Sequence, residues 1–178
     1  MTATRSSRPP ATARPMIAVI GASRADAALE AAAEAVGAGV ARGGAVLVCG
    51  GLGGVMAAAC RGAKDAGGTT VGLLPGEDRR AGNPWLDVAI PTGLGEGRNL
   101  LVVRSADALI AVGGGWGTLS EIALACRTGR PVVGLRTWAL QPPDGSDSPI
   151  VSVDEPADAV AVALRLAGDA ATFSGRNV

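Results

Sequence analysis

Three glycine-containing segments of this sequence have residue types that can bind an anion through main-chain amides. Each follows a short apolar run and precedes a helix-like stretch: GAS spans residues 21–23, GGLGG residues 50–54 and GGGWG residues 113–117. Glycines let several N–H groups converge on one anion, and a following helix N-terminus adds about half a positive charge. Each segment alone could instead be a tight turn that needs a positive φ. Because three occur together, we favour phosphate binding.

Two charged residues near these segments could take part in chemistry. Glu121 lies one turn after the third segment, where its carboxylate could face a bound sugar. Thr118 and Glu121 also have the spacing of a capping box, in which Thr118 caps the helix and Glu121 accepts from a main-chain N–H; the residues alone favour this cap. Arg98 follows two glycines at a predicted helix start, where its guanidinium could reach an anion. An ordinary solvated or salt-bridged arginine is the alternative.

The composition excludes several other kinds of site. The sequence has no histidine, so His-dependent triads and HExxH metal sites are excluded. Its three cysteines form no CxxC pair, which argues against a thiolate zinc site. Because 16 Lys and Arg balance 16 Asp and Glu, nucleic-acid binding through phosphates is not expected. The ATPase-loop pattern is absent and GxGxxG does not follow the first apolar run, which disfavours ATPase and NAD-dependent chemistry.

Short apolar runs alternate with helical stretches from Met16 onward. The predicted strands cover residues 16–20, 45–49, 69–74, 88–90, 108–112, 131–135 and 150–153. The predicted helices cover residues 25–42, 55–66, 98–104, 118–127 and 156–166. Continuously apolar strands indicate a parallel sheet covered on both faces, so we expect an α/β, Rossmann-like, doubly wound sheet of about six to seven strands. In such sheets ligands bind beyond the carboxyl ends of strands, where the glycine segments fall.

The length of 178 residues fits a single domain. We expect this domain to span residues 16–167, between a disordered N-terminal tail over residues 1–15 and a C-terminal tail over residues 168–178. Glycine or a charged residue interrupts every long apolar segment, so we expect no membrane span and no membrane partner. Widely spaced cysteines fit a reducing compartment, and we expect a cytoplasmic protein.

Taken together, these residues resemble the LOG (Lonely Guy) superfamily of Rossmann-like proteins, formerly labelled putative lysine decarboxylases. The family signature PGGxGTxxE is similar to GGGWGTLSE at residues 113–121. The segment GRNLLVVRSADALIAV, residues 97–112, resembles the family's upstream arginine, serine-aspartate pair and apolar strand. LVCGGLGGVM, residues 47–56, and VGLLP, residues 71–75, resemble its earlier strands and loops. The resemblance covers about residues 16–167.

The resemblance implies a set of site residues. Arg98 and Glu121 would be the catalytic pair that cleaves a base from ribose 5-phosphate, a reaction whose oxocarbenium-like transition state a carboxylate stabilises. The 5′-phosphate would be held at Gly114, Gly115, Trp116, Gly117 and Thr118. Ligand contacts from other loops are expected at Gly21, Ser23, Gly50, Gly51, Gly53, Gly54 and Asn99. No metal and no cofactor for hydrolysis are expected, and the family implies a homodimer or tetramer.

Two departures from the LOG pattern resemble a sister branch, the molybdenum-cofactor carrier proteins, which bind a phosphorylated pterin. Gly113 stands at the first position of the signature, where the family has proline, and Asn99 stands where the family has lysine. Two functions therefore stay open. One is hydrolysis of a nucleoside 5′-monophosphate, of the AMP or cytokinin riboside type, to free base and ribose 5-phosphate. The other is a non-catalytic carrier or sensor of a phosphorylated cofactor such as molybdenum cofactor.

The older lysine decarboxylase label does not fit the residues. A pyridoxal enzyme needs a lysine for its Schiff base. The one lysine, Lys64, falls in a predicted helix well before the proposed phosphate loop. We therefore do not expect a pyridoxal phosphate lysine decarboxylase.

Overall fold

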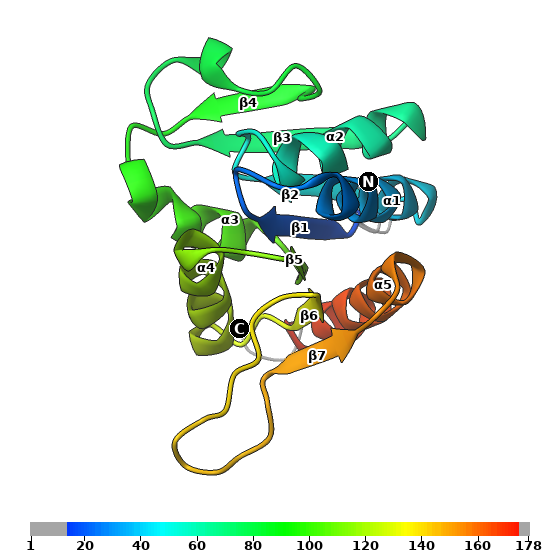
Figure 1. Cartoon of the computed structure of the whole chain (residues 1–178), viewed down its shortest axis with the longest axis vertical. Coiled ribbons are helices and arrows are strands. Elements are labelled where there is room, and N and C mark those ends of the chain that lie inside the picture. Colours follow the sequence, from blue (N-terminus) through cyan, green and yellow to red (C-terminus); the bar gives the residue numbers. More distant parts are fainter. Residues whose placement is uncertain (1–13, 175–178) are drawn as a thin grey trace, which may run out of the picture.

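A seven-stranded parallel sheet forms the centre of the molecule in the computed structural model, which describes residues 14–174. The strand order is β4-β3-β2-β1-β5-β6-β7 (Figure 1). The strands are β1 (Met16–Gly21), β2 (Val46–Cys49), β3 (Thr69–Leu74), β4 (Val88–Pro91), β5 (Ala108–Val112), β6 (Val132–Leu135) and β7 (Ile150–Val153). The predicted α/β, doubly wound fold is confirmed, because every pair of neighbouring strands runs parallel.

Five helices cover the two faces of the sheet. They are α1 (Ala27–Arg42), α2 (Val55–Asp65), α3 (Asn99–Ser105), α4 (Trp116–Arg127) and α5 (Pro156–Ser174), with short 3₁₀ turns η1 (Arg79–Ala81) and η2 (Gly95–Arg98) between them. Helices α1, α2 and α5 lie on one side of the sheet and α3 and α4 on the other (Figure 1). The molecule is therefore a three-layer α/β/α sandwich.

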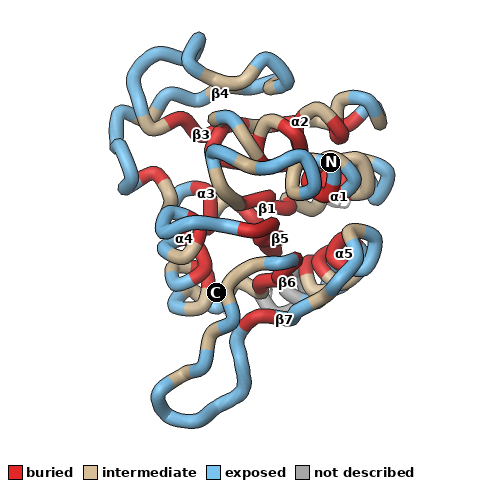
Figure 2. Tube along the Cα trace, in the orientation of Figure 1, coloured by how far each residue is buried: buried red, intermediate tan, exposed pale blue. Residues whose placement is uncertain are grey.

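The buried core divides into two clusters, one on each face of the sheet. Along β1, Ile17 and Val19 pack toward α1, α2 and α5, while Ala18 and Ile20 pack toward α3 and α4. This division follows from the alternation of side chains along a strand. Both faces are apolar because helices cover both, as the continuous apolar runs predict. Figure 2 shows burial concentrated in the central strands, with β4 and the loop between β6 and β7 exposed.

The chain reverses its winding direction at the centre of the sheet. Strands β2, β3 and β4 follow one another on one side of β1, and β5, β6 and β7 on its other side. The loops that leave β1 and β5 therefore turn to opposite faces and leave a crevice at the carboxyl ends of these strands. The first and third glycine segments form these two loops.

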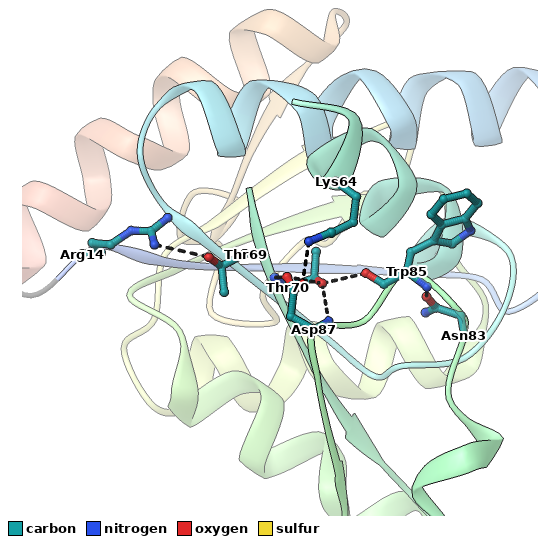
Figure 3. A network of polar contacts seen from close by, with 7 residues as sticks. All are labelled: Arg14, Lys64, Thr69, Thr70, Asn83, Trp85 and Asp87. Atoms are coloured by element: carbon teal, nitrogen blue, oxygen red, sulfur yellow. Dashed lines mark hydrogen bonds and ion pairs between the residues drawn. The ribbon is translucent and has the colours of Figure 1, made fainter. Parts of the chain in front are cut away.

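A polar network attaches the exposed edge strand β4 to β3 (Figure 3). The Thr70 amide donates to Asp87 Oδ2 at 2.9 Å, and the Asp87 amide donates to Thr70 Oγ1 at 2.9 Å. Lys64 Nζ pairs with Asp87 Oδ1 at 2.5 Å, and this contact is the largest cause that lowers the pKa of Asp87. The single lysine thus stabilises this edge of the sheet through its ion pair with Asp87.

Ordered contacts reach beyond residues 16–167 at both ends of the described chain. Helix α5 continues to Ser174, past its predicted end at Leu166 and past the predicted domain boundary at 167. Alanines on both sides of Gly168 have high helix propensity, which outweighs one glycine. Residues 1–13 of the expected N-terminal tail and 175–178 of the C-terminal tail lie outside the described residues, but Arg14 donates to the Gly44 carbonyl at 3.0 Å. No helix in the described part of the chain is long and apolar enough to cross a membrane.

Candidate functional site

A cavity of about 590 Å³ is lined by residues at or after the ends of the five strands β1 to β5. Its position matches the crevice where the winding direction reverses. The volume lies within the range of about 300–1,000 Å³ that is usual for small-molecule sites. The predicted site residues that line it are Gly21, Ser23, Arg98, Asn99, Gly115, Trp116, Gly117, Thr118 and Glu121.

The N-terminus of α4 borders this cavity and has no side-chain cap. The helix begins at Trp116, two residues earlier than predicted, and Gly115 is its N-cap with φ −116° and ψ −161°. Thr118 is thus the third residue of the helix, and the capping-box interpretation of Thr118 and Glu121 is wrong. The glycines of the loop allow an earlier helix start than a Thr cap would give. Because the first N–H groups of a helix have no intrahelical partner, this end can bind an anion.

The four glycines of the third segment have two different roles. Gly113 and Gly114 have φ values of +54° and +139°, which favour glycine. Proline, whose ring fixes φ near −65°, could not adopt the Gly113 conformation, so this departure from the LOG signature changes the loop itself. At Gly115 and Gly117, an added Cβ would meet no heavy atom within 4 Å. These two glycines leave open space on the cavity side of the loop.

Arg98 lies at the end of η2 with its guanidinium buried beneath the second glycine segment. The residue is 7% exposed, and an added Cβ at Gly50 would lie 1.9 Å from Arg98 Nη1. Nε and Nη1 are buried and have no hydrogen-bond partner among the described residues. Burial lowers the pKa of Arg98, while the nearby charges of Glu121 and Cys49 oppose that shift. A buried guanidinium with unpaired donors is costly. Because Arg98 lines the cavity, its positive charge favours an anionic ligand there.

Glu121 is the second buried charged residue of the cavity. It lies on α4, is 7% exposed and shares the cavity lining with Arg98. Burial raises the pKa of Glu121 to about 7, although the charge of Arg98 acts in the opposite direction. A carboxyl group with this pKa exchanges a proton near neutral pH, as a general acid or base must.

The glycines of the second segment support the site but do not line the cavity, which only Leu52 of this segment reaches. Gly50 leaves room for the Arg98 guanidinium, and Gly51, with φ +75°, packs against the Leu74 side chain. Gly54 has φ +59°, and an added Cβ there would lie 2.4 Å from the Ala22 carbonyl oxygen. Of the predicted ligand contacts, Gly50, Gly51, Gly53, Gly54 and Gly114 are absent from the lining. Gly53 and Gly54 pack against the loop after β1, and Gly50 packs against the Arg98 guanidinium. Gly114 packs against Thr118 at the start of α4.

Asn99 connects the two helices that border the cavity. Its Nδ2 donates to Ser120 Oγ at 3.0 Å, and Ser120 Oγ donates to the Gly117 carbonyl at 2.7 Å. This chain of bonds joins the start of α3 to the first turn of α4. Asn99 therefore contacts the third glycine segment through Ser120 as well as lining the cavity.

The structure adds lining residues that sequence reasoning missed. They are Ala22, Arg24, Leu52, Met56, Pro75, Gly95 and Glu96. Arg24 follows the first glycine segment directly, and such a cation beside an anion-binding loop is a signal that could have been used. The others are apolar, small or acidic residues whose place at the cavity depends on long-range packing. No group of three or more metal-ligating side chains occurs among the described residues.

Two tryptophans meet beside the third glycine segment. The ring centroids of Trp116 and Trp138 lie 5.3 Å apart at an interplanar angle of 40°. Trp138 Nε1 donates to the Gly115 carbonyl at 3.3 Å, and its side chain packs against the core cluster under α3 and α4. Sequence analysis did not place Trp138, because it lies 22 residues after Trp116 in a loop without a motif.

Comparison with solved structures finds two similar proteins of comparable length. The molybdenum cofactor binding protein from Rippkaea orientalis is 35% identical, with a TM-score of 0.79 over 85% of this chain and 96% of that chain. The molybdenum cofactor carrier protein from Chlamydomonas reinhardtii is 34% identical, with a TM-score of 0.77 over 87% of this chain and 99% of that chain. Both likenesses extend over nearly the whole of the similar protein.

A similar sequence and a family model complete the comparison. An uncharacterized protein of Archaeoglobus fulgidus is 47% identical over 120 residues, which are 67% of this chain and 79% of that protein. The model of the SLOG cluster4 family matches residues 14–160, most of the chain. The protein therefore belongs to the SLOG cluster4 family, a LOG-like branch near the molybdenum-cofactor carrier proteins.

Proposed function

We propose that this protein binds a phosphorylated small molecule at the N-terminus of α4 and serves as a carrier of molybdenum cofactor or a chemically similar phosphorylated pterin. The observation that carries the proposal is the state of Arg98. Its buried Nε and Nη1 have no partner among the described residues, and the residue lines the same cavity as the uncapped start of α4. Together these donors favour a ligand with a phosphate group.

The residues present fit the phosphate end of such a cargo. The open space at Gly115 and Gly117 admits a phosphate to the amides of α4, and the guanidinium of Arg98 supplies a charged donor. A cavity of about 590 Å³ has room for a ring system beside the phosphate. The similar proteins from Rippkaea orientalis and Chlamydomonas reinhardtii bind or carry molybdenum cofactor, which favours carriage over turnover.

Glu121 favours a second candidate, hydrolysis of a nucleoside 5′-monophosphate. Its buried carboxyl group, with a pKa of about 7, borders the space next to the phosphate loop. In that reaction the bond between the base and ribose C1′ breaks, and the base leaves with the bonding electrons and takes up a proton. Water adds its oxygen to C1′ and loses a proton, while the Glu121 carboxylate stabilises the positive charge that develops on the ribose.

Co-purification tests the carrier proposal. The protein is produced in a bacterial host that makes molybdenum cofactor and is isolated without oxygen, and the fluorescence of its oxidised pterin is then measured. We expect a pterin signal for the native chain and loss of most of it for Gly115→Val. The backbone at Gly115 is extended and suits valine, and the new side chain would fill the space for the phosphate.

The matched control is Gly168→Val, which adds the same side chain where a Cβ also meets nothing within 4 Å, but on α5. This variant should retain the pterin. Absence of pterin from the native protein, or equal pterin in the native chain and Gly115→Val, would contradict the carrier proposal.

Incubation with a panel of nucleoside monophosphates tests the second candidate: free base should appear with the native chain and not with Glu121→Gln if the protein is a hydrolase.

A further inference from the structure

We infer that Trp116 is a stacking platform for a flat heteroaromatic ring of the ligand. The site would then select phosphorylated compounds that carry such a ring over phosphorylated compounds that lack one. This inference rests on the proposed function, because it assumes that the phosphate binds at the start of α4. It adds the residue that contacts the ring and makes the site selective for it.

The first observation is the exposure of the Trp116 indole. Trp116 is 79% exposed, more than any other large hydrophobic residue among those the structure describes, and it lines the cavity. The chain has only three tryptophans, one phenylalanine and no tyrosine, so large aromatic surface is scarce. Two of the three tryptophans, Trp116 at the cavity and Trp138 beside it, contact each other. An indole left in water at the edge of a cavity is surface that a ligand ring can cover.

The second observation is the support that Trp138 gives to Trp116. A centroid separation of 5.3 Å with a tilt of 40° lies within the range preferred by aromatic pairs. Trp138 is itself held, by its bond to the Gly115 carbonyl and by packing against the core. Trp116 is therefore braced from one side and carries exposed surface that Trp138 leaves uncovered. A ligand ring that stacks there loses less entropy than one that must also order a mobile side chain.

The third observation is the position of Trp116 relative to the anion site. Trp116 is the first residue of α4, so its own amide belongs to the N–H groups that would bind the phosphate. A ligand anchored there by its phosphate therefore has its next groups within reach of the indole. Leu52 and Met56 also line this cavity and add apolar surface for a ring. One short segment thus provides both the anion site and the aromatic surface.

Calorimetry with three probes tests the inference. Ribose 5-phosphate carries a phosphate without an aromatic ring, whereas GMP and 6-hydroxymethylpterin phosphate each carry a phosphate and a flat ring. We expect Trp116→Ala to weaken binding of the ring-bearing probes about 10- to 100-fold, as loss of a base–aromatic stack does. Binding of ribose 5-phosphate should not change. Trp116→Phe should restore most of the lost affinity, because phenylalanine keeps an aromatic face.

The two ring-bearing probes distinguish a nucleotide from a pterin as the source of the ring. The matched control is Trp85→Ala, which removes a tryptophan that does not line the cavity and should leave every affinity unchanged. Equal binding of the ring-bearing probes by the native chain and Trp116→Ala would overturn this inference but not the proposed function. An equal loss of affinity for ribose 5-phosphate in Trp116→Ala would also overturn the inference. So would a change in oligomer mass between the native chain and Trp116→Ala, because that change would place Trp116 in a subunit contact. If the native chain binds none of the probes, the proposed function fails with it.

Discussion

Arg98 and Glu121 place two ionisable groups in a single cavity, away from most of the solvent. Burial disfavours the charged form of each, since it lowers the pKa of Arg98 and raises that of Glu121 to about 7. Without a ligand, the protein therefore keeps a charge arrangement that reduces its own stability. Such a cost is typical of residues that are retained for binding or chemistry.

At this scale we predict that Glu121→Gln changes the pH dependence of stability. The pKa of Glu121 is about 7 in the folded chain and near 4.5 in the unfolded chain, so the folded state binds more protons between these values. Stability of the native chain should therefore fall as pH rises through this window, by up to about 3 kcal/mol, and the glutamine variant lacks this loss.

Urea unfolding at pH 5 and pH 8 measures the effect. The difference in unfolding free energy between Glu121→Gln and the native chain should move by about 2–3 kcal/mol in favour of the variant from pH 5 to pH 8. The attraction between ionised Glu121 and Arg98 is present only at the higher pH and is already reflected in the pKa of about 7. An unchanged difference would mean that Glu121 does not titrate in this window.

At the scale of elements, the contact between α1 and α2 shows how the alanine- and glycine-rich composition is used. An added Cβ at Gly37 would lie 1.9 Å from the Ala59 carbonyl oxygen, and one at Gly62 would lie 2.0 Å from the Glu34 carbonyl oxygen. The two helices thus pack so closely that each glycine lies directly against the backbone of the other helix. Arg61 and Glu34 close the same contact with an ion pair at 2.6 Å.

Gly37→Ala should therefore destabilise the protein by about 1–3 kcal/mol, because the backbone of α2 must move. Helix propensity alone predicts the opposite sign, a gain of about 1 kcal/mol for alanine over glycine. Gly168→Ala is the matched control on α5, where a Cβ meets nothing within 4 Å, and it should be neutral or stabilising. Chemical denaturation compares the two variants, and equal stabilisation of both would show that α1 and α2 do not pack this closely.

Local patterns predicted the elements well and the side-chain contacts poorly. The strands follow from continuous apolar runs such as Ala108–Val112, whose residues are all buried. The seat of Arg98 beneath Gly50 joins residues 48 positions apart, and no local pattern encodes it. The capping box failed for a related reason: Thr118 and Glu121 have the correct spacing, but α4 starts at Trp116 and Glu121 turns into the cavity. Residue types and spacing already selected both charged residues as candidates, the family resemblance predicted their roles, and the structure supplied their burial.

At the scale of the whole molecule, we predict a homo-oligomer whose subunit contact includes residues 98–104. Leu94 and Leu101 are 55% and 38% exposed beside this segment, which is apolar surface that a second subunit can cover. Light scattering at micromolar concentration should give a mass at least about twice 17.5 kDa for the native chain. Leu101→Glu should weaken association by about 10-fold or more, because it would bury a charge in the contact.

Val151→Glu provides the control for the oligomer, since Val151 is 44% exposed on edge strand β7 rather than on α3. It should leave the mass unchanged. A native mass near 17.5 kDa would contradict the predicted oligomer. A mass that falls with Val151→Glu and not with Leu101→Glu would move the contact to the edge of the sheet.

The most direct test of the account is the contribution of the phosphate to ligand affinity. Calorimetry compares 6-hydroxymethylpterin with its phosphate, and guanosine with GMP, on the native chain and on Gly115→Val. The account predicts that in at least one pair the phosphorylated member binds the native chain about 10- to 100-fold more tightly, as charge-assisted hydrogen bonds would give. It also predicts that Gly115→Val abolishes this advantage. Equal affinity within both pairs, or an advantage that survives in Gly115→Val, would contradict phosphate binding at the start of α4.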